Sequence, residues 1–168
     1  MLNREGMKIN DLTIGGITIL ATYLLGTFLQ AFLHLSVGHH PRGGWFFRSH
    51  VGCHHTVYSG THLASERYED EETSLTVYYV LPSALAGWAA YRLLPPPLFW
   101  LHAVTMVVVF AVHVYVHVQF HLEKPWLDRF ALFRRRRRMH DIHHLAPDRN
   151  FAVIEPLWDR LFGTYQAP

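Results

Sequence analysis

Histidine is frequent in this chain of 168 residues, and most of the histidines fall into short clusters. Ten of the fourteen form four clusters: His34 and His39; His50, His54 and His55; His117 and His121; His140, His143 and His144. Neutral imidazole offers a lone pair near physiological pH, so histidine is the commonest transition-metal ligand. Ten such side chains are enough to hold two metal ions. The clusters predict a dinuclear metal centre with these ten ligands and no catalytic residue beyond them.

The spacing within the clusters predicts which imidazoles share a helix face. Residues three and four apart lie on one face, so we expect His140, His143 and His144 to converge on one site. The same rule pairs two further sets, His117 with His121 and His50 with His54.

Two histidines do not fit that rule. His55 lies about 100° round the helix from His54, so it would serve a second metal or need local unwinding near Gly52. His34 and His39 are five apart, which predicts a bend or a helix end between them. Gly38 would permit either, because glycine tolerates unusual backbone angles.

Other residues near the clusters have more ordinary interpretations. His113 extends the His117 stripe one turn deeper and would be a ligand, a support for a ligand or a packed core residue. His102 is expected to be a satisfied core histidine, and so are His40 and His62. Cys53, the only cysteine, excludes an internal disulfide. It is a possible thiolate ligand, but a small packed residue is favoured because a thiolate beside an oxygen-activating centre oxidises easily.

The donor set restricts the metal. Imidazole suits iron, zinc, copper and nickel, whereas magnesium and calcium prefer oxygen ligands. Ten histidines exceed the needs of a four-coordinate zinc site. Two redox-active irons with open positions for dioxygen would use the set best, and zinc would be a substitute in purified protein because it binds imidazole more tightly than ferrous iron.

Long apolar segments lie beside the clusters. Residues 12–33 carry no charge, enough for roughly 33 Å of helix, and residues 73–91 and 97–120 are further uncharged segments. Pro95, Pro96 and Pro97 mark the turn between the last two. We therefore predict an all-α fold in a single domain, residues 1–168: an integral membrane bundle of about three long spans with a His-rich helical cap.

Basic residues predict the orientation of these spans. Arg134–Arg138 are five consecutive arginines that follow the last span, and such residues favour the cytoplasmic side. Three spans then put residues 34–72, every histidine cluster and the C-terminus on the cytoplasmic side, and the N-terminus on the other. The arginines would set topology and contact anionic lipids. A nucleic-acid partner is not indicated, because no wider basic surface surrounds them.

The clusters together resemble the fatty acid hydroxylase superfamily, which includes sterol desaturases, sphingolipid hydroxylases and fatty acid 2-hydroxylases. The resemblance rests on the order His34-x4-His39, His50-x3-His54-His55, His117-x3-His121 and His140-x2-His143-His144. The segment NFAVIEPLWDRLFGTY, residues 150–165, is similar to the closing motif of that family. Together these motifs cover residues 20–166. Two features depart from the family pattern: three residues separate His50 from His54, and Ala152 stands where glycine is usual.

The resemblance implies a membrane-bound non-haem di-iron oxygenase. Such an enzyme takes dioxygen and electrons from a separate protein of the cytochrome b5, ferredoxin or reductase type, and hydroxylates or desaturates a lipid C–H position. The ten clustered histidines would be the ligands of two iron ions. The chain has no fused cytochrome domain, so an external donor is expected.

The closing motif also has an interpretation from its residues. Trp158, Phe162 and Tyr165 can pack against apolar helices or the membrane interface. Asp159 would pair with an arginine, hydrogen-bond a ligand histidine, or belong to a packed C-terminal cap.

Two other functions fit parts of the pattern. A metal-binding or metal-transporting membrane protein would place histidines or acidic residues along a transmembrane path, but the spans contain no acidic residue and only His102 and His113 as mid-span candidates. A zinc-dependent membrane hydrolase would use an H-E-x-x-H motif, which does not occur. The lipid oxygenase remains the leading hypothesis.

Overall fold

The structure is a computed structural model that describes the backbone of residues 4–70 and 74–168 and the side chains of residues 11–70 and 79–168. Its described residues form helices and loops, and the β-pairing among them is confined to two isolated bridges. The all-α prediction is therefore confirmed. The longer helices, in chain order, are α1 (Arg4–Leu33), α4 (Ser74–Leu93), α5 (Pro96–Phe120) and α6 (Ala131–Leu145). The shorter elements are η1 (His34–Gly38), η2 (Pro41–Gly43), α2 (Trp45–Ser49), η3 (His50–His54), α3 (His55–Val57), η4 (Trp126–Arg129) and α7 (Leu157–Phe162).

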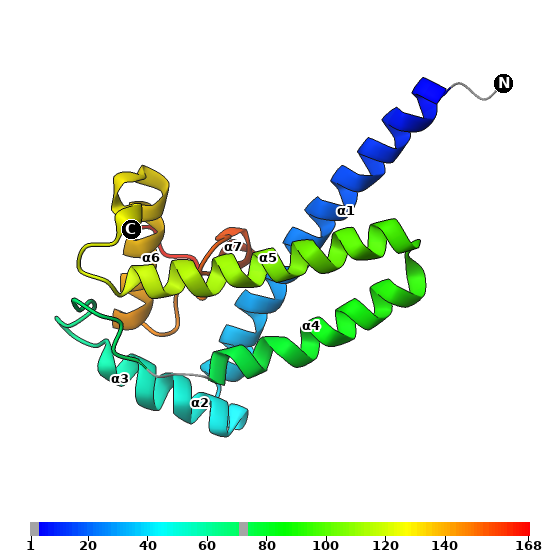
Figure 1. Ribbon diagram of the computed structural model, residues 1–168. Helices are drawn as coiled ribbons and strands as arrows, with labels where there is room; N and C mark the ends of the chain where they lie inside the picture. The colour runs from blue at the N-terminus through cyan, green and yellow to red at the C-terminus, as the bar shows by residue number, and fades with distance from the viewer. Residues whose placement is uncertain (1–3, 71–73) are drawn as a thin grey trace.

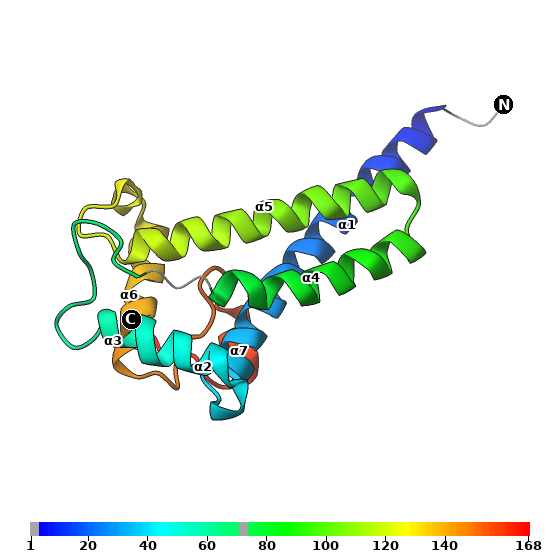
Figure 2. The ribbon, with the colours of Figure 1, turned by 60° about the horizontal axis from the view of Figure 1, so that its bottom comes forward.

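Three long helices make the body of the molecule. Helices α4 and α5 run side by side in opposite directions, and α1 crosses both (Figures 1 and 2). The chain reverses between α4 and α5 at Leu94 and Pro95, and α5 begins at Pro96. Proline suits the first helical position because its missing N–H would have no partner there. The remaining helices, α2, α3, α6 and α7, gather at the end of these three helices that lies away from the α4–α5 turn (Figure 1).

Two helical segments are long and apolar enough to cross a membrane by length and composition, Asp11–Gly38 and Pro96–Phe120. Only 11% and 22% of their apolar windows are buried, whereas the core helix of a soluble protein would be mostly covered. Large apolar side chains point outward along both, including Leu12 (78% exposed) and Val107 (66% exposed). Exposed apolar surface on this scale marks contact with a partner or a membrane.

These segments match two of the three predicted spans. The predicted span 12–33 lies within α1, which starts at Arg4, and the span 97–120 coincides with α5 to within one residue. The predicted span 73–91 begins outside the described residues; from Ser74 the chain is helical to Leu93, with Pro82 inside α4. The third crossing stays a prediction.

Two short π-helical turns carry three of the clustered histidines, His34, His50 and His54, at the end of the molecule where the short helices gather. The first, η1, continues α1, and the second, η3, lies between α2 and α3. In a π-turn the hydrogen bond runs from residue i+5 to residue i, so residues five apart come into register, and such turns are frequent at functional sites. Here the backbone N–H of His39 donates to the carbonyl of His34 at 3.0 Å, and that of His55 donates to His50.

Candidate metal centre

Nine of the ten predicted histidines lie in two groups whose ligand nitrogens are within 4.8 Å of one another inside each group. The first group consists of His34, His39, His50, His55 and His143. The second group consists of His54, His121, His140 and His144. The tenth, His117, lies beside the second group, with its ring centroid 4.8 Å from those of His54 and His140.

The two groups are neighbours. The rings of His55 in the first group and His144 in the second stack with centroids 4.2 Å apart. Two of the three His-His pairs in the sequence, His54-His55 and His143-His144, are divided, with one member in each group. His54 and His144 face the second group, while His55 and His143 face the first. The two segments that carry these pairs, η3 with α3 and α6, therefore each contribute histidines to both groups.

The π-turns explain the composition of the first group. They bring His34 over His39 and His50 over His55, so all four imidazoles reach one place. The prediction that His50 and His54 share one site is therefore wrong: α-helical spacing would pair them, but the π-turn places His50 with His55 in the first group and His54 in the second. The predicted unwinding near Gly52 is confirmed as the π-turn η3, which sends His54 and His55 to different groups.

Helix α6 divides its three histidines between the groups. His140 and His144, four residues apart, point together into the second group, and their Nε2 atoms are 3.1 Å apart. His143 is turned away toward the first group, where its ring lies 4.6 Å from that of His39. The prediction that His140, His143 and His144 converge on one site is therefore wrong. His143, which lies between His140 and His144 in sequence, belongs instead to the first group.

Backbone carbonyls orient many of the imidazoles. Four Nδ1 atoms lie within hydrogen-bond distance of a carbonyl oxygen: His34 to Phe151 at 2.7 Å, His121 to Leu63 at 2.9 Å, His143 to Arg149 at 2.6 Å, and His144 to Tyr58 at 2.7 Å. A carbonyl only accepts, so in each pair Nδ1 carries the proton and donates it. The Nε2 lone pair is then directed at the group, which is the arrangement found around metal-ligating histidines.

Asp70 orients His54 in the second group. Its Oδ2 atom accepts from His54 Nδ1 at 2.6 Å, and both side chains are buried. Tyr68 donates a further hydrogen bond to the same oxygen at 3.3 Å. A carboxylate in this place fixes the tautomer of a ligand histidine and strengthens it as a donor. Sequence reasoning missed Asp70, although the acidic run 69–72 that follows the second cluster was the available signal.

The closing motif holds a loop against the first group. Buried Asp159 accepts from the backbone N–H of Phe151 at 2.7 Å and of Ala152 at 3.0 Å. Asn150, with φ of 52°, donates to the carbonyls of Met139 at 3.1 Å and Gln166 at 3.0 Å, and asparagine tolerates this left-handed region better than most residues. The loop thereby places the carbonyl of Phe151 on His34. Of the three roles considered for Asp159, the packed cap is correct.

The clustered histidines outside the two long apolar segments are held in their neutral form. Burial, followed by the repulsion of neighbouring histidines, lowers the pKa of His54, His140 and His143 well below the usual value. Burial likewise lowers the pKa of His39 to about 2 and that of His144 to about 4. A neutral imidazole presents the lone pair that a metal ion needs.

Several buried ligand atoms point to a cation rather than to packing. Among the side chains that the structure describes, six Nε2 atoms have no hydrogen-bond partner: five belong to the clusters, those of His39, His54, His55, His117 and His143, and the sixth belongs to His102. Elsewhere Nε2 atoms face each other, at 2.7 Å between His34 and His50 and 2.9 Å between His121 and His140. Buried polar atoms are normally satisfied, and lone pairs that converge in this way suit a shared metal ion. The donor set fits a transition metal.

Other predicted residues lie outside the two groups. His113 is buried one turn from His117, its ring stacked at 6.2 Å. His102 is buried as expected, with 2.9 Å between its Nδ1 atom and the Thr22 hydroxyl, but the prediction that it is fully satisfied is wrong, because its Nε2 atom has no partner among the described residues. The core prediction is wrong for His40 and His62, which are exposed because they lie in surface loops. There His40 Nδ1 accepts from the Arg42 N–H, and His62 pairs with Glu69 at 3.0 Å.

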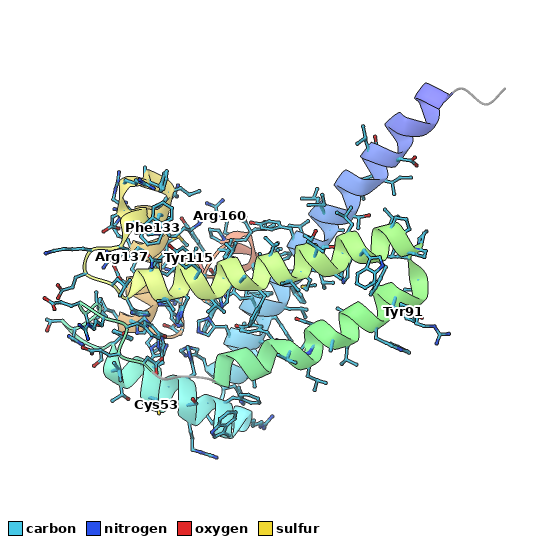
Figure 3. All side chains as sticks on the ribbon, viewed as in Figure 1. Cys53, Tyr91, Tyr115, Phe133, Arg137 and Arg160 are labelled. Atoms are coloured by element: carbon cyan, nitrogen blue, oxygen red, sulfur yellow. The ribbon has the colours of Figure 1, made fainter. Side chains whose placement is uncertain are left out.

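Cys53 also differs from its prediction. It is exposed rather than packed, and it points away from the molecule on the outer side of η3 (Figure 3). The π-turn directs His50, His54 and His55 inward, which leaves this position outside. Ala152, where the family pattern has glycine, is buried in the closing loop.

Comparisons with known proteins agree with this geometry. The sequence model of the family described as "Fatty acid hydroxylase" matches residues 19–164. The chain belongs to the fatty acid hydroxylase family. The matched range contains all ten clustered histidines, Asp70 and most of the closing motif.

One curated relative of this family member is "Cholesterol 25-hydroxylase-like protein 1, member 2" from Danio rerio, 29% identical over 164 residues. The match covers 90% of this chain and 51% of the relative, so the chain spans about half the length of that protein. No solved structure matches the chain.

Proposed function

We propose that this protein is a membrane-bound non-haem di-iron oxygenase that hydroxylates or desaturates a lipid C–H position. The proposal rests on one observation: two adjacent groups of buried, neutral imidazoles with unpartnered Nε2 atoms, in a chain of the fatty acid hydroxylase family. Dioxygen is the oxidant, and a separate protein of the cytochrome b5, ferredoxin or reductase type supplies electrons. Iron would be the native metal, with zinc as a substitute after purification.

The ten clustered histidines would hold the metals, five in the first group and five in the second once His117 is included. Two irons, when bound, supply the redox chemistry that activates dioxygen. The protein's own contribution is positional. Carbonyls and Asp70 fix the imidazoles, the closing loop covers the first group, and burial keeps water from the reacting carbon.

A path for the lipid runs between the long helices. A groove between α4 and α5, lined by Ser83, Trp88, Tyr91, Met106 and Val107 among others, is open to the outside. Ser83 and Met106 also line a smaller cavity that includes His113. A lipid chain would lie in this apolar groove, which adjoins the small cavity beside His113.

The membrane placement belongs to the same proposal: three spans, the histidine groups on the cytoplasmic side and the N-terminus opposite. The exposed residues Glu66 and Gln166 test it. In a Cys53→Ser background, Glu66→Cys and Gln166→Cys should both react with a membrane-impermeant thiol reagent only after cytoplasmic access is opened. Reaction of either cysteine in intact cells would contradict the cytoplasmic placement of that segment.

Metal and product analysis tests the function itself. Protein purified without oxygen in mild detergent should contain about two metal ions per chain. Lipids from cells that express the protein should include species that gain one oxygen atom or lose two hydrogen atoms, and His140→Ala should remove them at matched expression. Two bound metals without any lipid product would favour metal binding or transport instead.

A further inference from the structure

A small cavity lies between α1, α4 and α5 beside the histidine groups. Its walls include Gln30, Tyr79, Met106, Phe110 and His113, most of them apolar. The cavity measures about 20 Å³, which is room for about one water-sized group. It adjoins the groove between α4 and α5, since Ser83 and Met106 line both.

Two residues in the walls of this cavity each carry an unsatisfied polar atom. The Oε1 atom of Gln30 and the Nδ1 atom of His113 have no hydrogen-bond partner within the described part of the chain, although the two residues are only 3% and 5% exposed. The Nε2 atom of Gln30 donates to the carbonyl of Phe151 at 3.3 Å, which assigns the remaining atom as an oxygen acceptor. Buried polar groups are costly to leave unpaired, so these two atoms indicate a ligand.

Both residues are close to the metal groups. Gln30 precedes His34 by one helical turn, and His113 precedes His117 by one turn on α5. The carbonyl of Phe151 accepts from both Gln30 Nε2 and His34 Nδ1, so the two side chains share one partner. A group that binds between Gln30 and His113 therefore lies near the position where a C–H bond would be oxidised.

We infer that Gln30 and His113 recognise a hydroxyl group on the lipid, a few carbons from the oxidised position; this inference rests on the proposed function. Gln30 Oε1 requires a donor, and His113 Nδ1 donates or accepts according to its tautomer. A hydroxyl can donate to the first and also pair with the second. A ketone or ether oxygen only accepts and would leave Gln30 unpaired. The apolar groove, open to the bilayer side, favours a lipid alcohol over a water molecule as its source.

Binding without turnover tests this inference. The zinc-loaded protein in lipid nanodiscs is titrated with 1-hexadecanol and with its methyl ether, and binding is measured by native mass spectrometry. Wild type should bind the alcohol about tenfold more tightly, the usual effect of one buried hydrogen bond with an otherwise unpaired partner. In Gln30→Met the preference should fall to about twofold or less. Val104→Leu, at an exposed position of α5 that lines neither the cavity nor the groove, should keep it.

His113→Phe provides a second test, because Gln30 also supports the Phe151 carbonyl and its replacement could disturb the metal groups. Zinc content measured beside each titration separates the two effects. Equal binding of alcohol and ether by wild type would overturn the inference, and so would an alcohol preference that survives in Gln30→Met or in His113→Phe at unchanged zinc content, since the replaced residue would then not recognise the hydroxyl. Neither result depends on turnover, so a failure of the oxygenase proposal appears separately as missing lipid product.

Discussion

The two histidine groups are built from similar ligands but supported differently. The first group is assembled by two π-turns and held from outside by the closing loop, and two of its members, His39 and His55, remain partly exposed. The second group uses the i, i+4 pair on α6, all four of its members are buried, and the carboxylate of Asp70 supports one of them. The second group is thus the more enclosed and the more strongly supported by charge.

This difference predicts that the two groups differ in metal affinity and in metal exchange. A carboxylate hydrogen-bonded to a ligand histidine strengthens that ligand and its hold on a cation. Backbone carbonyls orient a ring without adding a formal charge. We therefore expect the second group to bind its metal more tightly, and the partly exposed first group to exchange metal and small molecules more readily.

The largest effects are expected from removing one ligand of each group. His140→Ala should abolish lipid product and reduce the metal content from two ions to about one, because His140 lies at the centre of the second group, 2.9 Å from His121 and 3.1 Å from His144 between Nε2 atoms. His143→Ala should also abolish product, but it should release the ion of the first group and leave the ion of the second group. Metal analysis and lipidomics at matched expression measure both outcomes.

His102→Ala is the control for both variants, since His102 is buried but lies outside the groups. Most of the activity should remain. Full activity in His140→Ala would refute the ligand assignment, and release of both metals by either variant would show that the groups do not bind independently.

A smaller effect is expected at Asp70. In a His143→Ala background, where only the second group retains all its ligands, Asp70→Asn should weaken metal binding about 10- to 100-fold, the usual effect of losing the partner of a ligand histidine. Competition with a fluorescent chelator measures the affinity. Glu69→Gln, next to it but exposed and paired with His62, is the matched control. An equal loss in a His140→Ala background would contradict the placement of Asp70 on the second group alone.

The comparison also shows what the sequence could predict. The long uncharged segments and the proline turn predicted two of the helices closely, because a span depends on local composition. All ten clustered histidines lie at one end of the bundle, as the cluster positions predicted. Which histidine belongs to which group was not predictable from α-helical periodicity, since the π-turns change the period from four residues to five.

The errors at single residues have a common physical cause. Exposure of His40 and His62 depends on how the surface loops fold, and exposure of Cys53 depends on the π-turn η3; an α-helical sequence pattern contains neither. Asp70 escaped notice for the same reason: it is sixteen residues from His54 in sequence, and only the tertiary fold places its carboxylate on that imidazole. The five-residue spacing of His34 and His39, repeated by His50 and His55, was the one local signal of a π-turn.

The closing loop should matter to the first group more than to the second. Asp159→Asn removes charge from a carboxylate that accepts hydrogen bonds from Phe151, Ala152 and Thr164. In a His140→Ala background we expect metal affinity to fall several-fold and stability to fall by about 1–3 kcal/mol, because an amide cannot satisfy all three donors. Chelator competition and thermal unfolding measure these changes. Asp148→Asn, an exposed surface pair with Arg149, should change neither, and loss confined to a His143→Ala background would reverse the assignment of the loop.

The smallest expected effect concerns pH, and it asks whether the two groups respond alike to acid. Burial lowers the pKa of His39 in the first group to about 2 and of His144 in the second to about 4, whereas an unfolded histidine titrates near 6.5. Below pH 6.5 the unfolded chain therefore binds more protons than the folded one, so stability is fully present above pH 6.5 and declines as the pH falls toward the folded values.

For metal-free protein in detergent, the melting temperature should accordingly drop between pH 7.5 and pH 5.5, and each neutral buried histidine should account for about 1.4 kcal/mol, or several degrees, of that drop. His39→Gln and His144→Gln should each reduce the drop by a similar share, because both remain neutral in the folded state throughout it. His40→Gln, at an exposed position, is the control. A melting temperature that rises toward pH 5.5 would contradict the neutral state of the buried histidines. A drop that only one of the two variants reduces would show that the two groups are not equally closed to protons.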